Sequence, residues 1–334
     1  MIDQFDWAHL THAYGKATDT PGHLAALTSS DEKARADALT HLYNAILHQG
    51  FPDETTAPAA YVVSWLIATD AVHGDVLGEL VEFLGAVASA TYELREDSMF
   101  APCIPELEAS VVETYPQIAR LLDSDSRSLR TRVAEAIVEQ LRLPQLASER
   151  PSMAHRLRRW LTHKDEDRHV WVRLLGELGE DVQEFLDDPD WAVRLRAALA
   201  PSSRHSARAL AILVDALADS LPAAVHRAEV VTGVIDGVDD FERIAEPATA
   251  IAQQARWTGF GSDWGPLLTF AFREPYRPGA PLSPGQKSFL RALTHNDELW
   301  DPRNGNIALL FKEAGLPRDR EQCERILTQA PHEC

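Results

Sequence analysis

An arginine that follows an acidic turn at a fixed distance recurs in this chain and constrains its fold more than any other feature. The clearest copy reads Asp187-Asp-Pro-Asp-Trp-Ala-Val-Arg-Leu-Arg-Ala-Ala-Leu-Ala200. Its carboxylates can accept hydrogen bonds from the free N–H groups of a helix start, where Pro189 is tolerated because no donor is needed. We therefore predict a helix that begins near Asp190. Its buried face is expected to carry Val193, Ala197 and Ala198, with Arg194 lying along the acidic turns of adjacent repeats.

The same pattern occurs elsewhere in the chain. Aligned on the arginine, residues 30–35 and 123–130 each continue into apolar residues at helical spacing, and residues 165–173 form a weaker copy. A unit that recurs in this way predicts stacked helical repeats instead of a single globule. Because the separations are irregular, we expect degenerate repeats of roughly 40 to 47 residues.

Hydrophobic periodicity predicts an all-α chain. Apolar residues recur at three- and four-residue steps with almost no alternating runs, and proline and glycine fall mostly between these segments. The segments with helical spacing are residues 39–47, 62–67, 76–87, 111–122, 133–141, 210–217 and 244–251.

Charge excludes some functions and favours others. The chain has 51 acidic and 32 basic residues and a formal net charge of −19. A nucleic-acid-binding protein normally has a basic excess, because neutralised phosphates supply most of its affinity. The acidic excess either solvates helix surfaces or faces a basic protein partner.

The expected cellular location rests on membrane-spanning segments, secretory signals and cysteine spacing. No apolar run approaches the ~20 residues that a membrane-spanning helix needs, and the amino terminus has no secretory signal. Cys103, Cys323 and Cys334 are odd in number and have no metal-ligand spacing. We therefore expect a cytoplasmic protein with no membrane segment.

Several segments resemble a family of actinobacterial HEAT-repeat proteins. The similarity covers residues 6–24, His48-Gln49-Gly50 with Ala57-Pro58-Ala59, and residues 282–287, 299–306 and 315–320. The chain departs from the family pattern at Phe51-Pro52-Asp53, where the family has a threonine and an aromatic residue. The resemblance implies a HEAT-type architecture and, because such arrays usually act as scaffolds, a role in binding.

The domain organisation follows from these observations. We expect residues 1–274 to form a curved α-solenoid of degenerate HEAT-like repeats. Residues 275–285 contain four prolines and two glycines and predict an extended connector. Residues 286–334 are expected to form a short helical C-terminal cap, since about fifty residues bury little independent core.

No motif indicates catalysis, a metal or a cofactor. His9 and His12 are spaced to share a helix face, but no cysteine or carboxylate stands at ligand spacing beside them, which argues against zinc. His48-Gln49-Gly50 is expected to end a helix, with Gly50 left-handed. No Gly-x-Ser-x-Gly element occurs, and the glycines at 259 and 261 lack the lysine of a phosphate loop.

One aromatic segment is a candidate partner-binding surface. Tryptophan, tyrosine and arginine are enriched at interface hot spots, and they gather around flexible glycines near residue 260. The alternative is that the two tryptophans pack the joint between the repeats and the terminal segment. The candidate partner-binding residues are Trp257, Phe260, Trp264, Arg273 and Tyr276.

The sequence therefore favours a non-catalytic protein that binds a basic partner. Specific forms are an immunity or antitoxin protein that blocks a basic toxin, and a scaffold or adaptor. The alternative is a HEAT-like enzyme with a pocket on its concave face, either a small-molecule lyase or a DNA glycosylase. Trp160, Trp171 and Trp191, with Arg156, Arg158 and Arg159, are the residues that a glycosylase would use to hold DNA.

Overall fold

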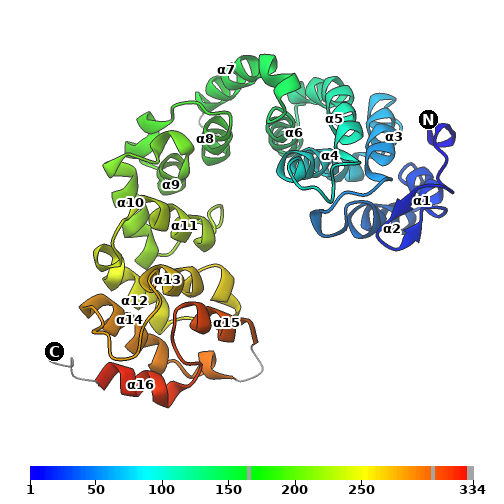
Figure 1. The fold of residues 1–334 in the computed structure, drawn as a ribbon. Helices are drawn as coiled ribbons and strands as arrows, with labels where there is room; N and C mark the ends of the chain where they lie inside the picture. Colours follow the sequence, from blue (N-terminus) through cyan, green and yellow to red (C-terminus); the bar gives the residue numbers. More distant parts are fainter. Residues whose placement is uncertain (164–166, 302–304, 329–334) are drawn as a thin grey trace. The chain divides into compact units, whose positions relative to one another are not determined.

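A computed structural model describes residues 1–163, 167–301 and 305–328 (Figure 1). Almost all regular structure in these ranges is helical. The exception is a short antiparallel pair, β1 (Thr11–His12) and β2 (Gly15–Lys16), in which Thr11 lies opposite Lys16. The prediction of an all-α chain is confirmed, and helices occur at each of the segments where the hydrophobic spacing indicated them.

The chain forms two compact units, Met1–Asp167 and Arg168–Cys334. Residues 275–283 are irregular as expected, but they lie inside the second unit, so the predicted division near residues 275–285 is not where the units separate. The reason is local packing. The Glu242 carboxylate accepts hydrogen bonds from the Ser283 hydroxyl and from the Gly285 N–H, which ties the end of the connector to the preceding helices.

Within the first unit, each of the helices α1 to α4 packs against the helix two places further along the chain. The helices α1, α3 and α5 form one layer, and α2, α4 and α6 form the other. Within the second of these layers, α4 and α6 approach closely because small residues line their contact: a Cβ atom on Gly85 would lie 2.9 Å from the Cα of Ala136. The helices are α1 (Thr20–Ala26), α2 (Glu32–His41), α3 (Thr56–Ala68), α4 (Gly74–Leu94), α5 (Ile104–Ala119), α6 (Arg127–Gln140) and α7 (Arg150–Leu161).

The second unit repeats this arrangement by itself. One layer contains α10, α12, α14 and α16, and the other contains α9, α11, α13 and α15. The helices expected near the carboxyl terminus are therefore part of the layered core. The helices are α8 (Arg168–Glu177), α9 (Trp191–Leu199), α10 (Ala207–Ala218), α11 (Arg227–Gly237), α12 (Ala245–Gln253), α13 (Trp264–Ala271), α14 (Pro284–His295), α15 (Gly305–Glu313) and α16 (Arg320–Thr328).

The recurrent arginine makes the same bond in each clear copy of the pattern. Each copy begins with a side chain that caps the helix, and the arginine four residues later donates to the carbonyl six residues before it. The bonds are Arg35 to Ser29 at 2.9 Å, Arg130 to Ser124 at 2.8 Å and Arg194 to Asp188 at 2.6 Å.

This geometry corrects one expectation. Arg194 closes on its own turn, at the carbonyls of Asp188 and Pro189, and not on the turn of an adjacent repeat. In the weaker copy, residues 165 and 166 lie outside the described residues, and Arg173 forms an ion pair with Glu177 one turn later on the same helix.

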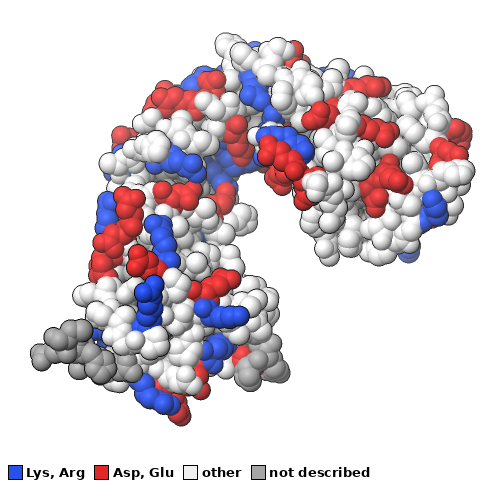
Figure 2. Space-filling model, in the orientation of Figure 1, with Lys and Arg blue, Asp and Glu red and all other residues white. Residues whose placement is uncertain are grey.

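Helix ends and surface charge follow the sequence. Gly50 is left-handed, with φ of 83°, as its place in His48-Gln49-Gly50 predicts. On the face drawn in Figure 2, acidic and basic side chains are interspersed.

Cys103 and Cys323 are free thiols, and Cys334 lies outside the described residues. No helix in the described ranges has both the length and the apolar character needed to cross a membrane.

Candidate functional site

The five predicted partner-binding residues separate into four environments. Trp257 is 50% exposed, whereas Trp264 is 0% exposed. Phe260 and Arg273 line one pocket, and Tyr276 lines another. The prediction that Trp264 contacts a partner is wrong, because its indole is enclosed in the core and its Nε1 donates to the carbonyl of Arg256 at 2.8 Å.

Two glycines, Gly259 and Gly265, allow close contacts in the segment around Trp264. The short helix η9 (Trp257–Gly261) precedes α13, and Asp263 caps α13 by accepting from the Trp264 N–H at 2.5 Å. A Cβ atom on Gly265 would lie 1.7 Å from the Phe260 carbonyl oxygen, and one on Gly259 would lie 2.2 Å from the Asp263 carboxylate. Burial raises the pKa of Asp263, although its bond to the Trp264 N–H and the charge of Arg227 oppose this.

The pocket next to this segment is the strongest candidate binding site in the second unit. It has a volume of about 770 Å³ and is mainly apolar, a size and character typical of ligand and side-chain binding sites. Leu309 on its wall is 58% exposed. We call it the Phe260 pocket; it is lined by Thr232, Ile235, Phe260, Gly261, Pro266, Thr269, Phe270, Phe272, Arg273, Asn306, Leu309, Leu310 and Glu313.

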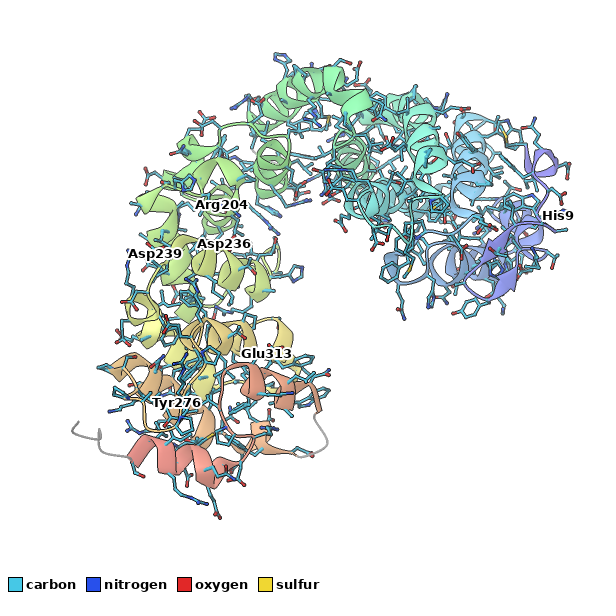
Figure 3. All side chains as sticks on the ribbon, viewed as in Figure 1. His9, Arg204, Asp236, Asp239, Tyr276 and Glu313 are labelled. Carbon is cyan, nitrogen blue, oxygen red and sulfur yellow. The ribbon has the colours of Figure 1, made fainter. Side chains whose placement is uncertain are left out.

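Two opposite charges accompany the apolar wall of the Phe260 pocket. The Arg273 guanidinium lies 4.8 Å from the centre of the Phe270 ring, and Glu313 ends α15 (Figure 3). Neither side chain forms an ion pair with another described residue. A partner entering this pocket can therefore pair with either charge without displacing an existing ion pair.

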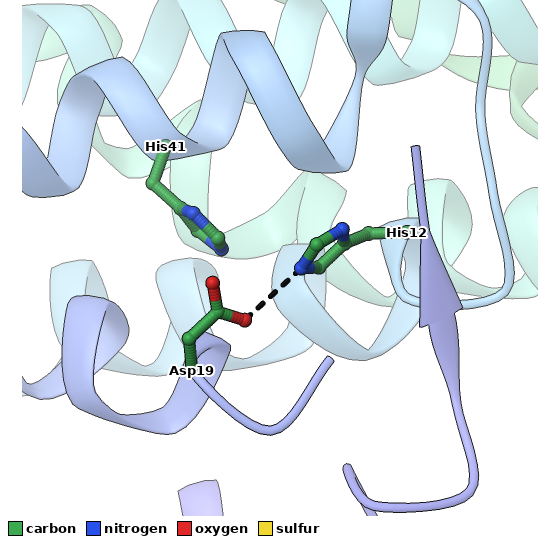
Figure 4. Close-up of side chains that lie close together, drawn as sticks. All are labelled: His12, Asp19 and His41. Carbon is green, nitrogen blue, oxygen red and sulfur yellow. Dashed lines mark hydrogen bonds and ion pairs between the residues drawn. The ribbon is translucent and has the colours of Figure 1, made fainter. Parts of the chain in front are cut away.

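A histidine cluster in the first unit brings together side chains from separate segments. His12 comes from β1, Asp19 precedes α1 and His41 ends α2 (Figure 4). The His12 Nε2 lies 3.0 Å from Asp19 Oδ1, and the His41 Nε2 lies 3.0 Å from the Thr20 hydroxyl. The His23 ring stacks on His41 with centroids 4.1 Å apart.

Asp19 places a carboxylate beside the histidines, although none stands at ligand spacing from His9 and His12 in the sequence. The ligand atoms of His12, Asp19 and His41 lie within 4.8 Å of one another, which is compatible with a metal ion. However, the Tyr14 N–H donates to His12 Nδ1 at 3.1 Å, so the ring proton is on Nε2 and points to Asp19. A metal at Nε2 would move that proton to Nδ1, against the Tyr14 N–H.

The cluster is therefore arranged for hydrogen bonding. Burial, with the neighbouring charge of His23, lowers the pKa of His41 to about 4. Burial opposes ionisation of Asp19, but the hydrogen bond from His12 leaves its pKa below the ordinary value. His9 does not share a helix face with His12, because it lies in a turn and its Nδ1 is 2.7 Å from the exposed Asp6 carboxylate.

The tryptophans proposed to hold DNA are mostly enclosed. Trp160 and Trp171 are buried, so neither ring is available to stack on a base. Arg156 lies over the Trp160 ring and forms an ion pair with Asp123, which neutralises part of the local basic charge. These contacts are those of helix packing.

Comparison with known proteins adds little. No protein-family model matches the chain, and no curated protein matches it. A crystal structure of an engineered protein is similar over 94% of this chain and 100% of its own, with 14% identity and a TM-score of 0.28. A similarity of that size supports no conclusion about fold or function.

Proposed function

We propose that this chain is a non-catalytic HEAT-repeat protein, of the kind found in actinobacteria, that binds a basic protein partner in the cytoplasm. The observation that carries the proposal is the Phe260 pocket, an apolar hollow with an exposed leucine on its wall. Soluble proteins rarely leave large apolar side chains grouped at the surface unless something covers them. The two-layer packing of the helices and the recurrent arginine support the repeat architecture.

The net charge of the chain favours a basic partner. With a net charge of −19, the chain attracts basic proteins over a distance of several ångströms and repels acidic ones. In the proposed complex, an apolar side chain of the partner fills the Phe260 pocket, and a basic group beside it pairs with Glu313. An immunity protein for a basic toxin and an adaptor for a basic protein are two forms of this function.

A purification under mild conditions tests the proposal. We expect the tagged chain to recover a basic partner that dissociates as the salt concentration rises from about 0.05 M to about 0.5 M. The double variant Trp257→Ser, Leu309→Ser should weaken binding about 30-fold, as expected when a hot spot of about 2 kcal/mol is removed.

The control is Met99→Ser, which removes an apolar side chain that is 79% exposed in the first unit. It should bind the partner as the unmodified chain does. Failure to recover any protein partner would count against the function. Equal binding by the double variant would show that Trp257 and the Leu309 wall of the Phe260 pocket are not the contact.

A further inference from the structure

A second pocket in the same unit carries only positively charged ionic side chains. Its volume is about 880 Å³, and it lies between the connector, α15 and α16. Three of its side chains are cationic and none is acidic, in a chain where acidic residues outnumber basic ones. We call it the Arg318 pocket; it is lined by Tyr276, Pro278, Gly279, Ala308, Lys312, Gly315, Leu316, Pro317, Arg318, Gln322, Arg325 and Ile326.

The wall of this pocket is held by a close crossing of two backbone segments. The Tyr276 N–H donates to the carbonyl of Ala314 at 2.9 Å. Gly315 is left-handed, with φ of 71°, and a Cβ atom there would lie 2.4 Å from the Tyr276 carbonyl oxygen. The positions of Tyr276 and of the loop that leads to Arg318 are therefore fixed by packing.

Arg318 is the least exposed of the three cations in the pocket. Its guanidinium lies 5.2 Å from the Trp300 ring centre and 5.5 Å from that of Phe311, and Nη2 donates to the Asp301 carbonyl at 3.3 Å. The buried Nη1 has no hydrogen-bond partner, which is rare for a buried polar atom and requires an explanation. Burial lowers the pKa of Arg318, so a nearby anion would stabilise its charged form.

The other two cations are more exposed. Lys312 on α15 forms no ion pair with a described residue, and Arg325 on α16 is 3.7 Å from Glu321, a distance at which an exposed pair contributes little. Apolar side chains from Pro278, Leu316 and Ile326 complete the lining. The pocket therefore offers positive charge beside an apolar surface.

We propose that the Arg318 pocket binds a small organic anion, a molecule with an apolar body and a carboxylate or phosphate group that pairs with Lys312, Arg318 and Arg325. Guanidinium groups bind both kinds of oxyanion through charge-assisted hydrogen bonds. The apolar body lies against the proline and aliphatic side chains. This site is separate from the Phe260 pocket, so it stands or fails independently of the proposed protein partner.

Two matched dyes test the charge requirement. Anilinonaphthalene sulfonate and N-phenylnaphthylamine have the same apolar body, but only the first carries an anion. In fluorescence titrations of the full chain, we expect the sulfonate to bind at least about tenfold more tightly than the neutral dye. The double variant Lys312→Gln, Arg325→Gln should weaken sulfonate binding by about tenfold and leave the neutral dye unaffected.

A second double variant controls for net charge and folding. Lys33→Gln, Arg320→Gln removes the same two positive charges from exposed ion pairs outside the pocket. It should bind the sulfonate as the unmodified chain does, and far-ultraviolet circular dichroism should show both variants folded. Equal binding of the two dyes, or equal loss in both double variants, would overturn the proposal.

Displacement of the bound sulfonate identifies the anionic group. Phenyl phosphate and benzoate share an aromatic body and differ in the group attached. We expect at least one of them to displace the dye, and the stronger competitor assigns the pocket to phosphorylated or carboxylated ligands. Failure of both to displace it would contradict the assignment to an organic oxyanion.

Discussion

Replacing His41 by glutamine should remove a large part of the acid sensitivity of the first unit. The His41 Nε2 contacts the Thr20 hydroxyl, and a glutamine amide can make the same hydrogen bond without titrating. In the folded chain the pKa of His41 is lowered from 6.5 to about 4, because the ring is buried beside His23.

The sign and size of the effect follow from that shift. Between about pH 6.5 and 4 the unfolded chain binds a proton at residue 41 and the folded chain does not, so acidification favours unfolding. Stability from this group is fully present above pH 6.5 and falls as the pH approaches 4. At about 1.4 kcal/mol per pKa unit, the loss in free energy of unfolding reaches about 3 kcal/mol.

Hydrogen exchange followed by mass spectrometry measures this locally. We expect peptides from α2 to lose protection between pH 7 and 4.5 in the unmodified chain, and to lose much less in the His41→Gln variant when both are compared at each pH. Peptides from α12 in the second unit serve as the internal control. Parallel pH curves for the two chains in α2, or protection that increases on acidification, would refute the reasoning.

Two further predictions concern stability. Gly265→Ala should lower the free energy of unfolding by about 3 kcal/mol, because the new Cβ atom would lie 1.7 Å from the Phe260 carbonyl oxygen. The control Gly22→Ala should not lower it, because nothing lies within 4 Å of that position; equal melting temperatures for the two variants would contradict this prediction. Arg130→Met and Arg194→Met should each lower the free energy of unfolding by about 1–2 kcal/mol, because each removes hydrogen bonds to backbone carbonyls. The control Lys33→Met removes an exposed ion pair and should lower it by less than about 0.5 kcal/mol. Similar urea midpoints for all three variants would count against this prediction.

Local signals predicted much of the fold. The start of α9 at Asp190 was predictable because capping depends on neighbouring residues, and the same holds for Gly50 at its helix end. The division into units was not, because the Pro-rich connector is tied down by Glu242, some forty residues earlier in the chain. Composition near a boundary does not reveal such a contact.

The candidate sites depended on contacts that sequence order hides. Trp257 and Trp264 belong to one aromatic segment, yet the first is exposed and the second is buried, and the close approaches at Gly259 and Gly265 form only when the segment folds. Asp19 joins His12 and His41 only after a turn and two helices have formed. The Arg318 pocket combines residues from three segments, so no linear motif marked it.

The arginine-to-carbonyl bond has a consequence for how such a chain can change its length. Arg35, Arg130 and Arg194 each close on a carbonyl six residues earlier, so the helix start is complete within one short stretch of sequence. Residues inserted or deleted between two copies do not break this bond in either of them. Insertions in the segments between copies therefore leave the helix starts intact. This accounts for copies that keep the same geometry at irregular intervals along the chain.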